Sequence, residues 1–133
     1  MKVTADTNVL LRFLIRDDEN QAIVAASVLT EAQVVAITLP ALCEVVWVLS
    51  RGYKLRSIDI AHAVEALIMS SNVAVNRKAV EAGLVLLRQG GDFADGVIAH
   101  EGKQLGADTF VSFDRKAVTL MHNNRQNARL LPP

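Results

Sequence analysis

Short apolar runs alternate along the chain with segments of helical periodicity, and this alternation limits the fold more than any other feature. The runs at residues 34–38, 73–75 and 109–112 are rich in β-branched or aromatic side chains, as is typical of buried strands. The longer segments between them carry apolar residues at helical spacing, for example Ile60 and Val64. Strands that alternate with helices form mainly parallel sheets. We therefore predict an α/β fold with a mainly parallel central sheet flanked by helices.

The composition predicts one domain with more apolar residues than its own core requires. The 133 residues suit a single domain over 1–133, and 51% of them are hydrophobic, enough for a core and for a surface that a partner covers. No apolar run approaches the ~20 residues that span a bilayer, and residues 1–6 lack the apolar core of a signal peptide. Cys43 is the only cysteine, so no internal disulfide can form. We expect a cytoplasmic protein that does not contact membranes.

The charge balance excludes one class of function. Fourteen basic and 14 acidic residues give a net charge of zero, whereas a domain that passively coats nucleic acid is strongly basic. An enzyme that acts on nucleic acid is not excluded, because a bound divalent cation adds positive charge that the sequence does not count.

Two acidic residues follow predicted strands. Asp6 joins the strand at residues 3–5 to a helix, and Asp114 follows the strand at 109–112. In open α/β sheets, ligands bind beyond the carboxyl ends of the strands. Either carboxylate could equally serve as a helix N-cap, so each alone leaves both roles open.

Glu44 lies in the run 41–49, whose other members are all apolar. A helix that is apolar all round is buried, and a buried carboxylate needs a basic partner, a proton or a metal. The alternatives are a salt bridge to Arg12 or Arg51, or a helix with one exposed seam. Trp47 in the same run is expected in the core.

Asp92 and Asp95 stand three residues apart, so on a helix they share a face and repel each other. Acids are favourable in the first turn of a helix, which accounts for Asp92 but less well for Asp95. A cation between Asp95 and another acid would relieve the repulsion. We expect the apolar residues of this helix to face inward: Phe93, Val97, Ile98 and Leu105.

Other chemical signals are weak. His62, His100 and His122 lie on separate segments without the spacing of a metal motif such as HExxH. The chain has no Walker A loop, no GxGxxG and no GxSxG. Cys43 is more simply explained as a core residue than as a nucleophile.

Four segments in order resemble the PIN domain, and within it the ribonuclease toxins of bacterial VapBC-type toxin–antitoxin pairs. They are residues 5–10, 42–49, 92–99 and 112–117, and together they extend over nearly the whole chain. Each segment is modest alone, but the ordered set is specific. The resemblance implies a three-layer PIN-like fold and an endoribonuclease that depends on Mg²⁺ or Mn²⁺.

By this resemblance, the metal-binding and catalytic acids are Asp6, Glu44, Asp95 and Asp114, and Asp92 matches a frequent extra acid. Mg²⁺ and Mn²⁺ are hard cations that prefer oxygen ligands. One metal lowers the pKa of a water that attacks the phosphodiester in line, and a second would stabilise the leaving oxygen. We expect Asp6 and Asp95 as core ligands. Asp114 would complete the site, directly or through water, and Glu44 would ligate the metal or orient the attacking water.

The hydroxyl and amide groups of Thr7, Asn8 and Ser112 would hydrogen-bond to the ligands from outside. Two residues depart from the family pattern. Ser112 stands where threonine is common, which keeps the hydroxyl. Gly96 stands where alanine is usual, which could loosen the turn that carries Asp95.

The resemblance also implies partners: an RNA substrate such as tRNA or rRNA, a cognate antitoxin, and a second copy of the chain in a homodimer. Three alternatives stay open. A receiver-type phosphoacceptor domain is also α/β, but it needs adjacent acids after the first strand, where Asp6 stands alone. A PIN-like module could have lost its activity and serve only in interactions. A nuclease of similar fold could act on DNA or in RNA maturation.

Overall fold

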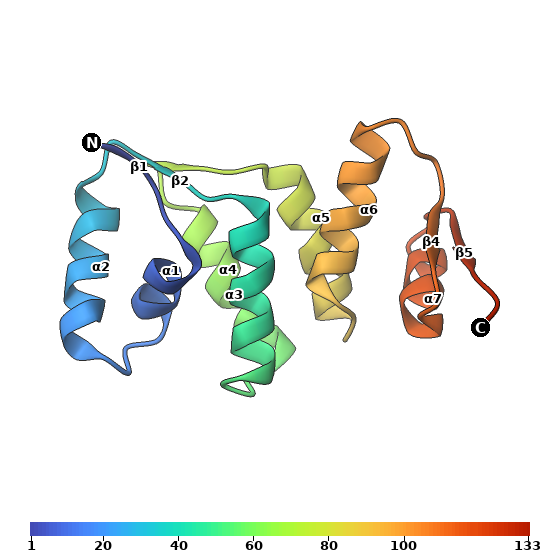
Figure 1. Ribbon diagram of the computed structural model, residues 1–133, viewed down its shortest axis with the longest axis horizontal. Helices are drawn as coiled ribbons and strands as arrows, with labels where there is room; N and C mark the ends of the chain where they lie inside the picture. The colour runs from blue at the N-terminus through green and yellow to red at the C-terminus, as the bar shows by residue number, and fades with distance from the viewer. The chain divides into compact units, whose positions relative to one another are not determined.

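The computed structural model describes all 133 residues, which fall into two compact units, Met1–Asn76 and Arg77–Pro133 (Figure 1). Both units combine short strands with longer helices, so the α/β class predicted from the sequence is confirmed. None of the helices has the length and apolarity that crossing a membrane requires.

The first unit is built on a three-stranded sheet in the order β1-β2-β3. Its elements are β1 (Lys2–Thr4), α1 (Thr7–Leu14), α2 (Glu19–Glu31), β2 (Val34–Ala36), α3 (Leu39–Arg51), α4 (Ser57–Ile68) and β3 (Val73–Ala74). All pairings are parallel, with Val3 opposite Val35 and Val35 opposite Val73. Parallel neighbours need crossover connections, and here helices provide them.

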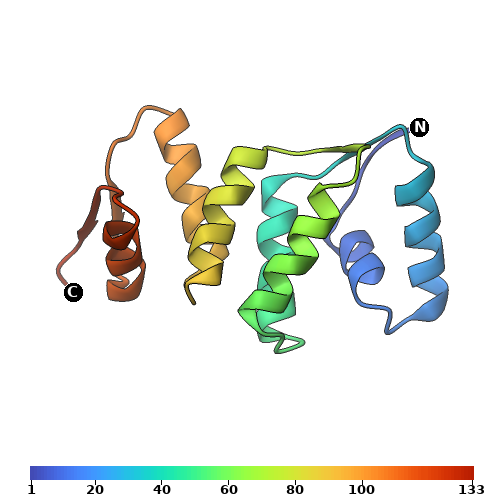
Figure 2. The ribbon, with the colours of Figure 1, turned by 180° about the vertical axis from the view of Figure 1, so that it is seen from behind.

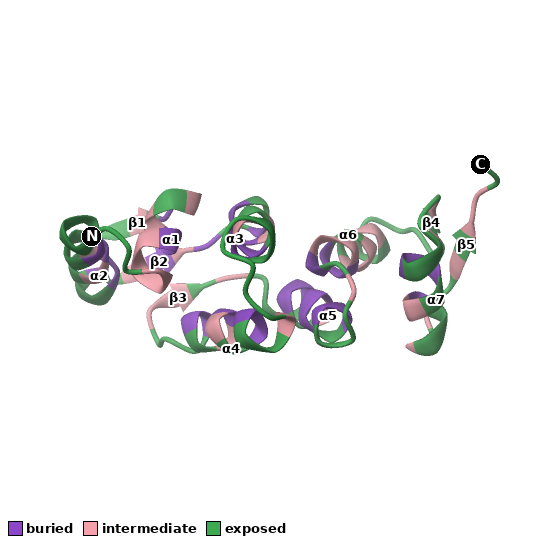
Figure 3. Ribbon diagram, turned by 90° about the horizontal axis from the view of Figure 1, so that it is seen from below, coloured by how far each residue is buried: buried purple, intermediate pink, exposed green.

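The core of this unit lies where α1, α3 and α4 present their apolar faces. Helix α1 contacts both α2 and α3, and α3 contacts α4. Leu10, Leu42, Val45 and Val64 are completely buried. Along α4, buried and exposed residues alternate around the helix (Figure 3), as the spacing of Ile60 and Val64 predicts.

The second unit contains α5 (Arg77–Arg88), α6 (Phe93–Gln104), β4 (Phe110–Ser112), α7 (Arg115–Asn123) and β5 (Ala128–Leu130). Strands β4 and β5 form a parallel pair with Phe110 opposite Ala128. Helices α5 and α6 lie side by side (Figure 2). A Cβ on Gly96 would stand 2.4 Å from the carbonyl oxygen of Ala82, so only glycine permits this approach. Gly96 therefore allows close packing of α5 on α6. The sequence suggested instead that Gly96 loosens the turn that carries Asp95, and its position in this helix contact does not support that role.

Several expectations need correction. The sequence predicted one central sheet, but the strands are hydrogen-bonded in two groups, β1-β2-β3 and β4-β5; all pairs are parallel, as predicted. Trp47 is 61% exposed and not in the core. Phe93 and Val97 are buried as expected, whereas Ile98 is exposed because α6 buries only the face that packs on α5, and Leu105 is exposed because it lies beyond the last residue of α6.

Candidate active site

Asp6 connects β1 to α1 and caps that helix. Its Oδ1 accepts a hydrogen bond of 3.0 Å from the backbone N–H of Val9, which satisfies one of the free donors at the helix start. The other oxygen, Oδ2, has no donor in the protein. Thr7 and Asn8 follow in the first turn of α1. Capping and metal binding are therefore compatible in Asp6, since each can use a different oxygen.

Asp114 repeats this geometry after β4. Its Oδ1 accepts from the backbone N–H groups of Lys116 at 2.9 Å and Ala117 at 3.3 Å, and it caps α7. The hydroxyl of Ser112 accepts from the N–H of Asp114 at 3.0 Å. Ser112 thus orders the turn that presents the carboxylate, and its expected hydrogen bond to a metal ligand stays a prediction.

Asp92 and Asp95 lie at the start of α6. Asp92 is the N-cap, and its Oδ1 accepts from the N–H groups of Ala94 at 2.7 Å and Asp95 at 3.4 Å. Asp95 is half-buried in the first turn. Burial, together with the negative charges of Asp92 and Asp114, raises the pKa of Asp95 from 3.8 to about 6. The second unit therefore gathers three carboxylates whose charges oppose one another.

Glu44 does not have the environment predicted for it. Its side chain is exposed on α3, although its neighbours Leu42 and Val45 are completely buried. Trp47, one turn further on, is exposed beside it in the helix. Helix α3 thus has one exposed seam, which was the alternative reading of the run. No salt bridge joins Glu44 to Arg12, which pairs with Asp17 instead.

The predicted acids divide between the units: Asp6 and Glu44 lie in the first, and Asp92, Asp95 and Asp114 lie in the second. Neither unit by itself gathers three His, Cys, Asp or Glu side chains closely enough to hold a metal ion. The donors nevertheless fit a hard divalent cation, because they are all carboxylates and the repulsion at Asp95 is of the kind that a cation relieves. The assembly of the four acids into one site stays a prediction.

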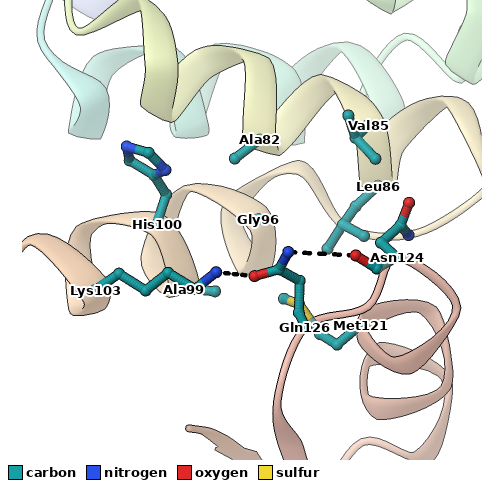
Figure 4. Close-up of a pocket in the computed structure, with 10 residues that line it drawn as sticks. All are labelled: Ala82, Val85, Leu86, Gly96, Ala99, His100, Lys103, Met121, Asn124 and Gln126. Atoms are coloured by element: carbon teal, nitrogen blue, oxygen red, sulfur yellow. Dashed lines mark hydrogen bonds between the residues drawn. The ribbon is translucent and has the colours of Figure 1, made fainter. Parts of the chain in front are cut away.

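Two hollows on the units contain residues that the sequence did not single out. Asp6 lines a groove of about 440 Å³ between α1 and α2, together with Gln21 and Asn20. A second pocket, of about 270 Å³, lies among α5, α6 and α7 (Figure 4).

The pocket of Figure 4 contains none of the predicted acids. Lys103 donates a hydrogen bond to Gln126, whose amide donates to the carbonyl oxygen of Asn124 at 3.3 Å. His100 Nε2 is buried there without a hydrogen-bond partner. The burial and hydrogen bonding of these polar residues depend on packing between helices. No local sequence pattern could therefore have predicted that they line a pocket.

Comparison with known families gives one match that extends over most of the chain. The PIN domain family model matches residues 3–120, a range that includes all five acids predicted for the site and extends over both units. None of the curated proteins matches the sequence. The strand-to-helix turns that carry Asp6 and Asp114 lie inside the matched range. Because one family model accounts for most of its length, the chain belongs to the PIN domain family.

Proposed function

We propose that the chain is a Mg²⁺- or Mn²⁺-dependent endoribonuclease that acts as the toxin of a toxin–antitoxin pair in the cytoplasm. PIN domains are generally nucleases and typically use a divalent metal, so the family supports a hydrolase acting on nucleic acid. The observation that carries the proposal is the half-buried position of Asp95 beside Asp92 and Asp114: burial, and then the charges of these two acids, raise the pKa of Asp95 to about 6. Groups with such perturbed pKa values concentrate at functional sites.

Each acid has a role in this proposal. Asp6 and Asp95 hold the cation, and Asp114 completes its ligands directly or through a water. Glu44 is free to ligate or to orient the attacking water, since it is exposed and forms no salt bridge. When bound, the cation supplies a water of lowered pKa and positive charge opposite the phosphate. Ser112 and the helix N-termini keep the carboxylates in place through the hydrogen bonds described above.

The test is RNA cleavage by the purified chain on total tRNA and rRNA, with Mg²⁺ or Mn²⁺ and with EDTA. Asp6→Asn is the informative variant, because asparagine is an equally good N-cap and changes only the charge. Asp18→Asn is its matched control: Asp18 caps α2 through a 3.1 Å hydrogen bond to the N–H of Gln21, outside the proposed site. Cleavage lost in EDTA and in Asp6→Asn, but kept in Asp18→Asn, would support the proposal.

No cleavage by folded protein free of any co-purified partner would favour the inactive interaction module. Cleavage of single-stranded DNA in preference to RNA would favour the third alternative. The receiver-type reading does not fit membership of the PIN family. Cleavage that survives in Asp6→Asn would reject the proposed ligand set.

Whether the acids act in one site can be measured by calorimetric titration with Mn²⁺. Asp6→Asn and Asp95→Asn should each weaken Mn²⁺ binding, and the double variant should bind little more weakly than the worse single variant. Residues that act as a unit show such non-additivity. Fully additive losses of binding free energy would mean that the two acids serve separate sites.

The toxin role implies an antitoxin and a homodimer, and exposed apolar side chains support such partners. Ile23 and Val24 on α2, Trp47 on α3, and Val111 and Phe113 beside Asp114 are all more than half exposed. Growth arrest on expression, relieved by Asp95→Asn or by coexpression of a neighbouring gene, would support the toxin role. Light scattering that shows a strictly monomeric chain would contradict the homodimer.

A further inference from the structure

The groove between α1 and α2 has the size and chemistry of a nucleotide site. Its volume of about 440 Å³ lies in the range of sites for single small molecules. Asp6 stands among its lining residues, so whatever occupies the groove lies beside a proposed catalytic carboxylate. We infer that the groove holds an RNA base flanking the cleaved bond, and that Gln21 selects bases with a keto oxygen. This inference rests on the proposed nuclease function.

The orientation of Gln21 is set by its neighbours. Arg12 Nε donates a hydrogen bond of 2.7 Å to Gln21 Oε1. Because the donor is an N–H group, the amide must turn its oxygen toward Arg12, and its NH₂ group is the end without a protein partner. Gln21 therefore presents a hydrogen-bond donor, and not an acceptor, to the groove.

Arg12 is itself held in position. Its Nη1 lies 3.0 Å from Asp17 Oδ1, and the hydroxyl of Tyr53 donates to Asp17 Oδ2 at 2.7 Å. The Tyr53 hydrogen bond and the Arg12 charge lower the pKa of Asp17, so this carboxylate stays ionised at neutral pH. Tyr53, Asp17 and Arg12 thus form a chain of contacts that ends at Gln21. Side chains ordered before binding lose less entropy when a ligand arrives.

The rest of the groove suits a base better than a phosphate. Val9 and Val24 give it an apolar wall, and Val24 is 63% exposed, so a flat ring would cover apolar surface that now faces water. The cation of Arg12 is already paired with Asp17. Asn8 and Asn20 add amides that can both donate and accept. Neutral amides read base edges, whereas phosphates are held mainly by free cations.

A lone donor distinguishes bases by one exocyclic group. Uracil and guanine present a keto oxygen where cytosine and adenine present an amino group. The Gln21 NH₂ group can donate to the keto oxygen but meets another donor in the amino bases. One net hydrogen bond corresponds to a preference of roughly three- to tenfold. The expected cutting pattern therefore favours uracil and guanine at one flanking position.

Gln21→Glu replaces the free hydrogen-bond donor of this side chain by an acceptor, with little change of shape. Arg12 Nε can still donate to the new carboxylate, while the free end becomes an acceptor. An acid near the start of α2 is favourable, so the variant should fold. Gln33→Glu is the matched control, since Gln33 is exposed, lies outside the groove and adds the same charge.

The experiment has two arms. In the first, an unstructured RNA randomised around one cut site is cleaved with Mn²⁺, and the ratio of keto to amino bases at each flanking position is sequenced. In the second, UMP, GMP, CMP and AMP are titrated into the protein in EDTA while NMR follows the backbone amides of α1 and α2. The wild type and Gln33→Glu should both prefer keto bases, and Gln21→Glu should lose or invert the preference.

The outcomes separate the inference from the function on which it rests. No cleavage by the wild type would reject the nuclease function. The nucleotide titration would still show whether the groove binds nucleotides and prefers keto bases. Equal cutting beside all four bases, or a ratio unchanged in Gln21→Glu, would overturn the inference while leaving the nuclease intact. In the titration, signals that do not move in α1 and α2, or that move equally for all four nucleotides, would overturn it as well.

Discussion

Replacing Asp95 by asparagine should stabilise the metal-free protein at neutral pH while abolishing cleavage. Asp95 is half-buried in the first turn of α6, and its pKa is raised by burial and by the charges of Asp92 and Asp114. Above that pKa the ionised carboxylate opposes folding. Asparagine has nearly the same shape without the charge, so the variant removes the electrostatic repulsion and a proposed metal ligand together.

The magnitude follows from the pKa. A rise from 3.8 to about 6 is roughly two units, and each unit corresponds to about 1.4 kcal/mol, so the upper limit is about 3 kcal/mol. Partial exposure screens the charges, and the variant also loses a favourable acid near the helix N-terminus. We therefore expect a gain of about 1–2 kcal/mol in the free energy of unfolding, or roughly 3–8 °C in Tm.

The pH dependence has a definite sign. Because the pKa of Asp95 is higher in the folded state than in the unfolded chain, the folded protein binds more protons between about pH 4 and pH 6. The stability of the wild type relative to Asp95→Asn should fall through this window and level off above it. The two proteins should therefore differ little near pH 4 and most at pH 7 and above.

Urea unfolding of both proteins in EDTA, at several pH values between 4 and 8, measures this difference directly. The difference curve removes the contributions that the two proteins share and reports Asp95 together with its repulsion from Asp92 and Asp114. Added Mn²⁺ should stabilise the wild type more than the variant, because a ligand stabilises the state that binds it. A variant that is less stable in EDTA at pH 7.5, or a difference that does not change with pH, would refute the reasoning.

Three further predictions concern single residues. Gly96→Ala should destabilise the protein by about 1–3 kcal/mol in urea unfolding, since the new Cβ meets the Ala82 carbonyl oxygen at 2.4 Å. Gly102→Ala in the same helix, with its nearest neighbour at 4.0 Å, should instead gain up to ~1 kcal/mol, and equal effects would disprove the packing argument. Asp6→Ala should lower the free energy of unfolding by about 1 kcal/mol because it removes the N-cap of α1, whereas Asp6→Asn should keep the cap and the stability. If only the alanine variant lost cleavage, Asp6 would serve as a cap and not as a metal ligand. Trp47, the only tryptophan, should fluoresce as a water-exposed indole in the monomer and shift to shorter wavelength when a partner covers α3; blue-shifted emission from a monomer would contradict its exposure.

The helix starts illustrate what could be predicted from the residues alone. Asp6 and Asp114 cap helices, which is one of the two roles that the sequence left open for each of them. A cap is a hydrogen bond between residues two or three apart, so its partners lie within the same short segment. The same locality explains why the alternation of strands and helices predicted the α/β class, which membership of the PIN family supports.

The candidate site was predicted less completely. The order of the acids led to the family. The burial expected for Glu44 was wrong, because the run 41–49 does not show that one face of α3 is exposed to water. The role of Gly96 was also misjudged, since the approach of Ala82 comes from another helix. Gln21 was missed altogether, because its orientation depends on Arg12, nine residues away on α1.

The sequence by itself determined the alternation of helices and strands, the parallel pairing of the strands and the identity of the acidic residues. These features depend on periodicity and on hydrogen bonds within a few residues, which are local properties of the chain. Only the tertiary structure decided which face of α3 and α6 is exposed, how closely α5 approaches α6, and which end of the Gln21 amide is free. Those features depend on contacts between elements distant in sequence, where burial and steric fit outweigh local preference.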